Sequence, residues 1–172
     1  MVRKRMYLIV TRNFPPEIGG MQNLMWGLAN ELSKNFMIKV FADYYKDHNI
    51  YDERVSFSID RVGGIKLFRK YRKAQLINEF IKENKVEAII ADHWKSLELL
   101  KTNNKKICLI HGKEINHEKD TNLNKRVLKV LNNVETIVAN SEYTKDLAIS
   151  LGVQQDKIVV INPGVNQVQE LD

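Results

Sequence analysis

The segment Met6–Lys34 reads MYLIVTRNFPPEIGGMQNLMWGLANELSK. It starts with a short apolar run, passes through a loop with two prolines and two glycines, and ends in a stretch with helical period. The apolar residues of that stretch share one helical face: Met21, Leu24, Met25, Leu28 and Leu32. The segment therefore predicts a strand at Met6–Val10 followed by a helix at Gly20–Lys34.

The same alternation continues along the chain. Further strands are expected at Met37–Ala42, Arg54–Val62, Glu87–Ala91, Lys106–Ile110, Glu135–Ala139 and Lys157–Ile161. Further helices are expected at Lys66–Asn84, Lys95–Lys101, Asn122–Asn132 and Glu142–Leu151, with Gly152 as the glycine that ends the last one. Strands that are apolar along their length are covered on both faces, so the pattern predicts an α/β, Rossmann-like three-layer sandwich with a mostly parallel sheet.

Composition narrows the class of protein. The 172 residues suit one domain, and 44% hydrophobic residues exclude a disordered chain. The single cysteine, Cys108, cannot form a disulfide within the chain, which favours a reducing compartment. No run approaches the ~20 apolar residues of a membrane span. The net charge of +6 favours anionic partners, with an ordinary lysine-rich surface as the alternative.

Ligands of parallel α/β sheets bind at the carboxyl ends of the strands. The loops that leave those ends are Thr11–Gly20, Asp92–Lys95, His111–Asp120 and Asn140–Ser141. We expect the functional residues in these four loops.

In the first loop, Gly19 and Gly20 precede a helix. Backbone without Cβ atoms lets a ligand come close, and the free N–H groups of a helix start suit a phosphate. Pro15 and Pro16 are expected to hold the preceding loop in an extended course. The alternative is that the glycines only form a tight turn. The loop is neither a GxGxxG fingerprint nor a GxxxxGK[ST] phosphate loop.

In the third loop, His111, Gly112, Lys113 and Glu114 follow the strand Lys106–Ile110. The histidine is a candidate acid, base or hydrogen-bond donor, and the carboxylate is suited to orient a sugar hydroxyl. A polar loop with a capping histidine is the alternative. The HxxExxHE spacing matches no zinc pattern, so no metal is expected.

Two further positions have two interpretations each. Asp92, His93 and Trp94 follow an expected strand and offer polar and stacking groups to a sugar or a lipid head group, but a capping aspartate and a core tryptophan would produce the same sequence. Ser141 is the expected N-cap of the last helix, and it could also face the ligand.

The segment from Lys66 to Asn84 is rich in cations. Leu67, Tyr71, Ala74, Ile77 and Ile81 share one face, and the basic residues Lys66, Arg69, Lys70, Arg72 and Lys73 lie elsewhere. Such a helix could rest on an anionic membrane surface. The favoured alternative is a helix that packs this face against the sheet.

Together these stretches resemble the amino-terminal domain of retaining GT-B glycosyltransferases of family 4, including those that mannosylate phosphatidylinositol mannosides. The stretch NFPPEIGGMQNLMWGLANELSK is similar to their donor-phosphate loop and first helix. IHGKE is similar to their histidine-glycine loop, and the stretch from ANSEYT to PGVN is similar to the segment that closes their first domain.

The resemblance implies roles for these residues. Gly19, Gly20, Met21 and Ser141 would contact a nucleotide-sugar donor, and His111 would hydrogen-bond the transferred sugar. The acceptor side would be formed by His93, Lys113 and Glu114. The leaving diphosphate would take the acceptor proton, and no cofactor or metal would be required, so the site would work by orientation and charge stabilisation.

The resemblance also implies that a donor-binding second domain is missing. Residues 1–162 would be the acceptor-side domain and residues 163–172 the start of a linker, with Asn166 at a position where the family more often has aspartate. We therefore expect half of a cytoplasmic transferase, inactive alone, acting on a glycan or lipid-linked acceptor, with contact to the inner face of the membrane left open. The alternatives are a non-catalytic binding module and half of a nucleotide-sugar epimerase.

Overall fold

The computed structural model describes residues 5–164. Its strands are β1 (Met6–Val10), β2 (Met37–Asp43), β3 (Ser58–Val62), β4 (Val86–Ala91), β5 (Lys105–Ile110), β6 (Thr136–Ala139) and β7 (Ile158–Val160). Its helices are α1 (Gly20–Ser33), α2 (His48–Asp52), α3 (Lys66–Glu83), α4 (Trp94–Leu97), α5 (Asn122–Leu131) and α6 (Glu142–Ser150), with a 3₁₀ turn at Gln155–Lys157. Most of the expected linker, from residue 165 on, lies outside the described residues.

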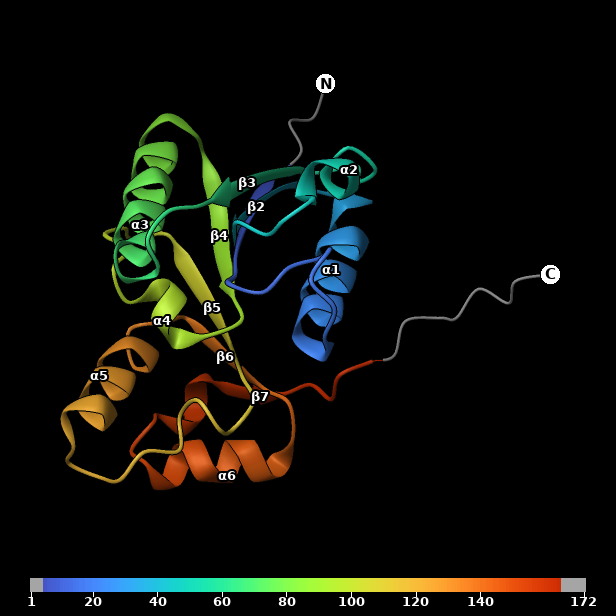
Figure 1. The fold of residues 1–172 in the computed structure, drawn as a ribbon. Helices are drawn as coiled ribbons and strands as arrows, with labels where there is room; N and C mark the ends of the chain where they lie inside the picture. Colours follow the sequence, from blue (N-terminus) through green and yellow to red (C-terminus); the bar gives the residue numbers. More distant parts are fainter. Residues whose placement is uncertain (1–4, 165–172) are drawn as a thin grey trace.

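The strands form one parallel sheet in the order β3-β2-β1-β4-β5-β6-β7 (Figure 1). The chain first moves outward from β1 to β3 and then returns to the other side of β1. The strand order therefore reverses between β1 and β4, which is where ligands bind in open α/β sheets. The Rossmann-like fold class expected from the sequence is confirmed.

Two hydrophobic cores make the three layers. On one face of the sheet, Met25 and Ala29 of α1 pack with Ile9 and Val40. On the other face, residues of α3, α4, α5 and α6 pack on the sheet: Ile77, Trp94, Leu97, Val127, Leu131 and Ala148. Figure 1 shows α1 and α3 on opposite sides of the strands.

Three elements differ from the expected ones. Only Ser58–Val62 of the expected strand Arg54–Val62 is a strand. The preceding Val55 and Phe57 lie in a loop, but their side chains still pack into the hydrophobic core beneath α1. This packing explains why apolar and polar residues alternate there although no strand is formed. The short helix α2 was not expected, and the expected helix Lys95–Lys101 is only the single turn α4.

Helix α3 packs on the sheet over only part of its length. Ala74 and Ile77 are buried, as expected. The expected packing of Leu67 and Tyr71 is wrong, since their side chains are 70% and 53% exposed. Lys73, expected among the solvent-facing cations, is buried.

The end of α6 agrees with the sequence. Gly152 follows Leu151 with a φ of 103°, and Val153 N–H donates to the carbonyl of Ala148 at 3.1 Å. This is a Schellman motif, whose glycine has a conformation that costs other residues ~1–2 kcal/mol.

We therefore expect Gly152→Ala to lower the free energy of unfolding by ~1 kcal/mol in urea titrations. An added Cβ would meet Leu128 only at an ordinary contact distance of 3.6 Å, so the backbone conformation is the cause. The control is Gly20→Ala, where no heavy atom lies within 4 Å of the new Cβ. Equal effects of the two substitutions would contradict this explanation.

Candidate functional site

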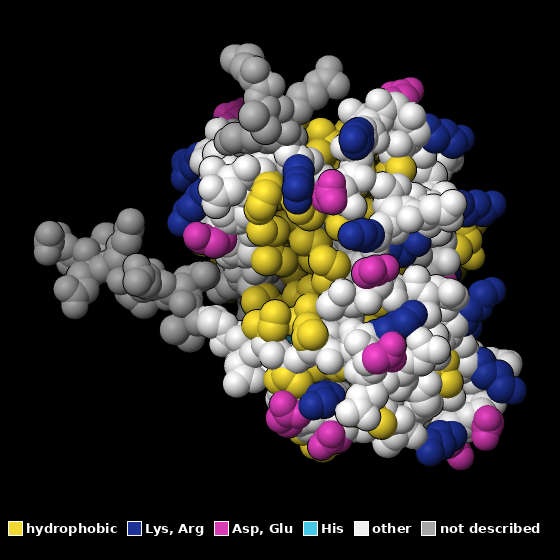
Figure 2. Space-filling view, turned by 180° about the vertical axis from the view of Figure 1, so that it is seen from behind, with side chains coloured by type: hydrophobic (Ala, Val, Ile, Leu, Met, Phe, Trp, Pro, Cys, Tyr) yellow, Lys and Arg dark blue, Asp and Glu magenta, His cyan; other side chains and the backbone are white. Residues whose placement is uncertain are grey.

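A cavity lies at the carboxyl edge of the sheet, between α1 and the loop after β5. We call it the α1 cavity. It measures about 790 Å³, and its lining includes Gly20, Met21, Leu24, His111 and Pro163. Figure 2 shows a face of the molecule on which hydrophobic side chains gather in a hollow. The structure thus brings together Gly20, Met21 and His111, which are 91 positions apart at the extremes in the sequence.

Donor groups at this cavity lack partners. No side chain caps the start of α1, and the space where a Gly20 Cβ would stand is empty to 4 Å. The Nε2 atom of His111 is buried and has no hydrogen-bond partner among residues 5–164. A ligand with several acceptor oxygens would satisfy both groups.

Gly19 precedes the cavity lining and has extended backbone, with a φ of 166°. A Cβ there would lie 2.3 Å from Oε1 of the buried Gln22. A larger residue at position 19 would therefore push this amide away from the start of α1.

The loop Thr11–Gly20 does not run in an extended course. It turns at Pro15 and Pro16, so the expectation for the prolines is wrong. Two contacts hold the loop against the core. Phe14 is buried against Phe57, and Arg61 donates to the carbonyl of Pro15.

The histidine loop is held by its own residues. Gly112 has a φ of 103°, and Oε1 of Glu114 accepts a hydrogen bond from the backbone N–H of His111 at 2.6 Å. Trp94 Nε1 donates to the carbonyl of Glu114 at 2.9 Å. The Glu114 carboxylate thus faces its own loop, while Lys113 is exposed to solvent.

Ser141 is next to Thr144, which lies close to Gly112 of this loop. Its hydroxyl caps α6 by accepting from Thr144 N–H at 3.2 Å, and a Cβ on Gly112 would stand 3.5 Å from the Thr144 hydroxyl. The capping interpretation is therefore confirmed for Ser141. The structure does not place Ser141, His93, Lys113 or Glu114 in the lining of the α1 cavity.

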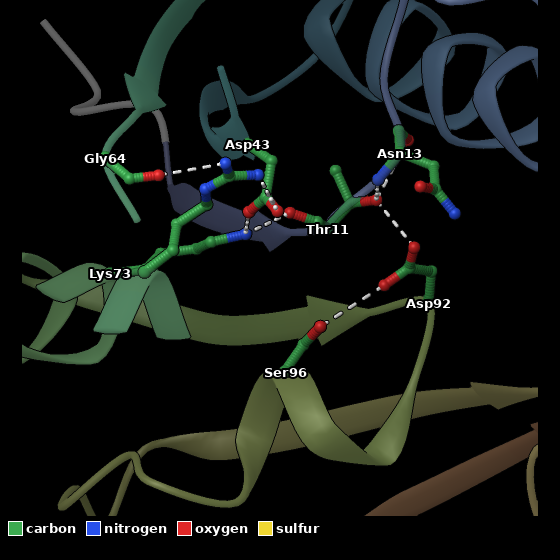
Figure 3. Close-up of polar contacts among 8 residues, drawn as sticks. Thr11, Asn13, Asp43, Gly64, Lys73, Asp92 and Ser96 are labelled. Carbon is green, nitrogen blue, oxygen red and sulfur yellow. Dashed lines mark hydrogen bonds and ion pairs between the residues drawn. The ribbon is translucent and has the colours of Figure 1, made fainter. Parts of the chain in front are cut away.

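A buried polar network fills the point where the strand order reverses (Figure 3). The hydroxyl of Thr11 donates to Asp92 at 2.6 Å, and Ser96 donates to the other Asp92 oxygen at 3.4 Å. Lys73 Nζ donates to the Thr11 carbonyl at 2.6 Å and forms an ion pair with Asp43. Burial raises the pKa of Asp92 and lowers that of Lys73, while the Asp43 carboxylate opposes the shift of Lys73.

Sequence reasoning missed this network. Asp92 was expected either to offer a polar group to a ligand or to cap a helix, but the N-cap of α4 is His93, whose Nδ1 accepts from Lys95 N–H at 3.0 Å. Trp94 is a core residue, as one of the two interpretations held. The sequence positions of Thr11 and Asp92 could have indicated their contact. Each residue directly follows a strand, and the two strands are neighbours in the sheet.

Within residues 5–164, no group of three or more His, Cys, Asp or Glu side chains is placed to hold a metal ion. No helix in the same range has the length and apolar character of a bilayer-spanning segment.

His93 should make stability depend on pH. Burial, followed by the charges of Lys95, Arg12 and His111, lowers the pKa of His93 from 6.5 to about 4. Between these values the unfolded state binds more protons than the folded state, so stability is complete above about pH 6.5 and falls toward pH 4.

We expect His93→Asn, which keeps a capping acceptor but cannot titrate, to remove this dependence. Relative to the variant, the native chain should lose up to about 3 kcal/mol between pH 7 and pH 4 in urea titrations. The raised pKa of Asp92 makes an opposite contribution to the pH dependence of stability. This contribution is present in both proteins, so it cancels when the free energy of unfolding of the variant is subtracted from that of the native chain. Parallel pH profiles would contradict the assignment.

Several solved structures share the fold of this chain. Anabaena HepE in complex with UDP-glucose matches with a TM-score of 0.70 at 12% identity, over 95% of this chain and 45% of that one. Sucrose-phosphate synthase of Thermosynechococcus elongatus matches with a TM-score of 0.72 at 14% identity, over 95% and 49%. UDP-N-acetylglucosamine 2-epimerase of Rickettsia bellii matches with a TM-score of 0.68 at 7% identity, over 94% and 45%.

These identities establish the fold alone, and the chain spans less than half the length of each of these proteins. No curated protein sequence matches the chain. The family model for Glycosyltransferase Family 4, however, matches residues 18–168, which is most of the sequence. The chain therefore belongs to glycosyltransferase family 4.

Proposed function

We propose that this chain is the acceptor-side half of a retaining glycosyltransferase that moves a sugar from a nucleotide-sugar donor to a glycan or lipid-linked acceptor. The observation that carries the proposal is the meeting of Gly20 and His111 in one cavity. Both belong to stretches that resemble the donor site of the family, and they lie far apart in the sequence. HepE, which has the same fold, binds UDP-glucose, and this makes a nucleotide sugar the first donor to test.

The donor would lie with its diphosphate at the start of α1. The positive end of the helix dipole and the uncapped N–H groups of Gly20 and Met21 would stabilise the charge that grows on the leaving diphosphate. His111 Nε2 would hydrogen-bond the transferred sugar, and the diphosphate would take the proton of the acceptor hydroxyl. The contribution of Ser141 would be indirect, through the loop that Thr144 supports.

The acceptor would approach from the side of His93. This residue lies near His111, whose charge lowers its pKa, and near neutral pH it is uncharged. Lys113 is free to reach an acceptor because its side chain is exposed. Glu114 would position His111 through the loop hydrogen bond of 2.6 Å. In this proposal no metal or other cofactor takes part.

We propose a cytoplasmic location with peripheral contact to an anionic membrane. The start of α3 exposes a large apolar group beside several cations. Its apolar members are Ile65, Leu67, Phe68 and Tyr71. Lys66, Lys70 and Arg72 flank them, and this combination is typical of interfacial helices.

A second domain would complete the site and supply most donor contacts, as in other two-domain transferases that close around their substrates. The epimerase of Rickettsia bellii shares the fold, so the fold alone does not separate transferase from epimerase. The family match favours the transferase. A module that has lost catalysis would retain the cavity without turnover.

We expect His111→Ala, in a form that carries the donor-binding domain, to lower sugar transfer ~100-fold, since it removes a hydrogen bond at the reacting centre. Binding of UDP-glucose should change little because the diphosphate contacts remain. His117→Ala, in the same loop, is the matched control and should retain activity. Unchanged turnover of the His111 variant would remove this residue from the mechanism.

The 172-residue chain alone should bind UDP-glucose weakly, with a Kd of ~1 mM or above, because few of the contacts that offset the cost of association are present. Isothermal titration calorimetry measures this directly. Micromolar binding would show that the donor site is complete within this chain, against the proposal.

A further inference from the structure

A second hollow lies on the other side of the sheet, between α3 and α4. We call it the basic pocket. It has a volume of about 180 Å³ and reaches the carboxyl ends of β1 and β2. Six basic residues line it: Arg12, Lys66, Arg69, Lys70, Lys73 and Lys95. Its two acidic residues are Asp43 and Glu98, so it holds an excess of four positive charges.

Both carboxylates of the basic pocket already have cationic partners. Asp43 forms ion pairs with Lys73 and with Arg69, the latter at 3.1 Å. Glu98 is held by the guanidinium of Arg126, which lies outside the pocket, at 2.7 and 2.9 Å. The remaining basic residues, Arg12, Lys66, Lys70 and Lys95, form no ion pair within residues 5–164. Their charges are available to a ligand.

The size and charge of the pocket indicate the ligand class. Its volume is below the ~300–1,000 Å³ of pockets that hold drug-sized ligands, so it suits a small group of a larger molecule. A phosphate carries up to two negative charges and three strong acceptor oxygens, and arginine and lysine together are its usual protein partners. A carboxylate would leave more of the positive charge uncompensated.

The basic pocket lies beside the proposed acceptor path. The charges of Arg12 and Lys95, which line the pocket, both lower the pKa of His93, and so does the charge of His111. Lys95 N–H also donates to Nδ1 of His93 at 3.0 Å. Arg12 follows β1, His93 follows β4 and His111 follows β5, so all of these residues lie at the carboxyl edge of the sheet. An acceptor anchored at Arg12 and Lys95 would pass His93 on its way to His111.

We propose that the basic pocket binds a phosphate group of the acceptor substrate. This proposal rests on the transferase function and narrows it: the acceptor is a phosphate-bearing compound, either a lipid with a phosphate headgroup or a soluble phosphorylated sugar or polyol. The exposed cations hold the phosphate, and the ion pair of the buried Lys73 with the partly buried Asp43 also lines the pocket.

The test is direct binding of glycerol 3-phosphate to the 172-residue chain by calorimetry, without donor. The double variant Arg12→Gln/Lys95→Gln should weaken binding at least ~10-fold, since each lost charge-assisted hydrogen bond corresponds to about that factor. The control double variant Lys82→Gln/Lys125→Gln removes the same charge from exposed positions outside the pocket and should change binding less than ~2-fold. All four side chains are exposed, so folding should persist, as circular dichroism would verify.

Vesicles distinguish the two sources of the phosphate. If it belongs to a lipid, the chain should co-sediment with vesicles of phosphatidylcholine that contain phosphatidic acid, and the Arg12/Lys95 variant should co-sediment much less. If it is soluble, glycerol 3-phosphate should bind, and any co-sedimentation through the exposed start of α3 should be the same in the native chain and the Arg12/Lys95 variant. Each result supports the basic pocket as a phosphate site.

Two results would overturn the proposal. One is equal weakening by the pocket variant and the control variant, which would reduce the effect to net charge. The other is an absence of glycerol 3-phosphate binding together with vesicle binding that is absent or the same in the native chain and the pocket variant. Neither measurement involves donor or turnover, so failure here leaves the transferase proposal standing, and loss of transfer by His111→Ala can be scored separately.

Discussion

The reversal of strand order between β1 and β4 is the constraint on which the rest of the structure depends. The connections that follow these two strands cross to opposite faces of the sheet, so no helix within residues 5–164 covers the gap between the carboxyl ends of β1 and β4. Thr11 and Asp92 fill that gap as a buried hydrogen-bonded pair. A buried carboxylate is tolerated only with partners, and Lys73, held by Asp43 and the Thr11 carbonyl, supplies the nearby charge. The network thereby ties β1, β2, β4 and α3 together beneath the site.

That gap separates two surfaces of different chemistry along one edge. On the α1 side, free amide groups and the unpaired Nε2 of His111 face a largely apolar cavity. On the α3 side, a small hollow is lined by four cations that form no ion pair within residues 5–164. His93 lies near both and is neutral at neutral pH, so it adds no charge between them. The proposed reaction would join two anionic substrates, and it would need this separation because two clusters of negative charge would have to approach without sharing one binding site.

The sequence predicts most of the framework because that framework depends on local patterns. Apolar runs identify the strands, and the glycine after Leu151 marks the end of α6. The meeting of Gly20 and His111 was also predictable, since both follow strands of one parallel sheet. The sequence-based predictions were wrong where the structure of a residue depends on contacts with residues far away in the sequence. Phe57 looks like part of a strand but is a loop residue drawn into the core of α1, and Lys73 looks like a surface cation until Asp43, 30 positions away, neutralises it.

The fold alone does not determine the reaction, which depends on the loops at the carboxyl edge of the sheet. The Rickettsia bellii epimerase matches the fold of this chain at 7% identity, so the fold by itself is compatible with more than one reaction. What distinguishes this chain is how its histidine loop is built. Gly112 makes a turn that few other residues could make, and the Glu114 carboxylate fixes the backbone at His111. Neither the turn at Gly112 nor the hydrogen bond to Glu114 uses the imidazole, so Nε2 of His111, which has no partner among residues 5–164, remains available to the ligand that we propose.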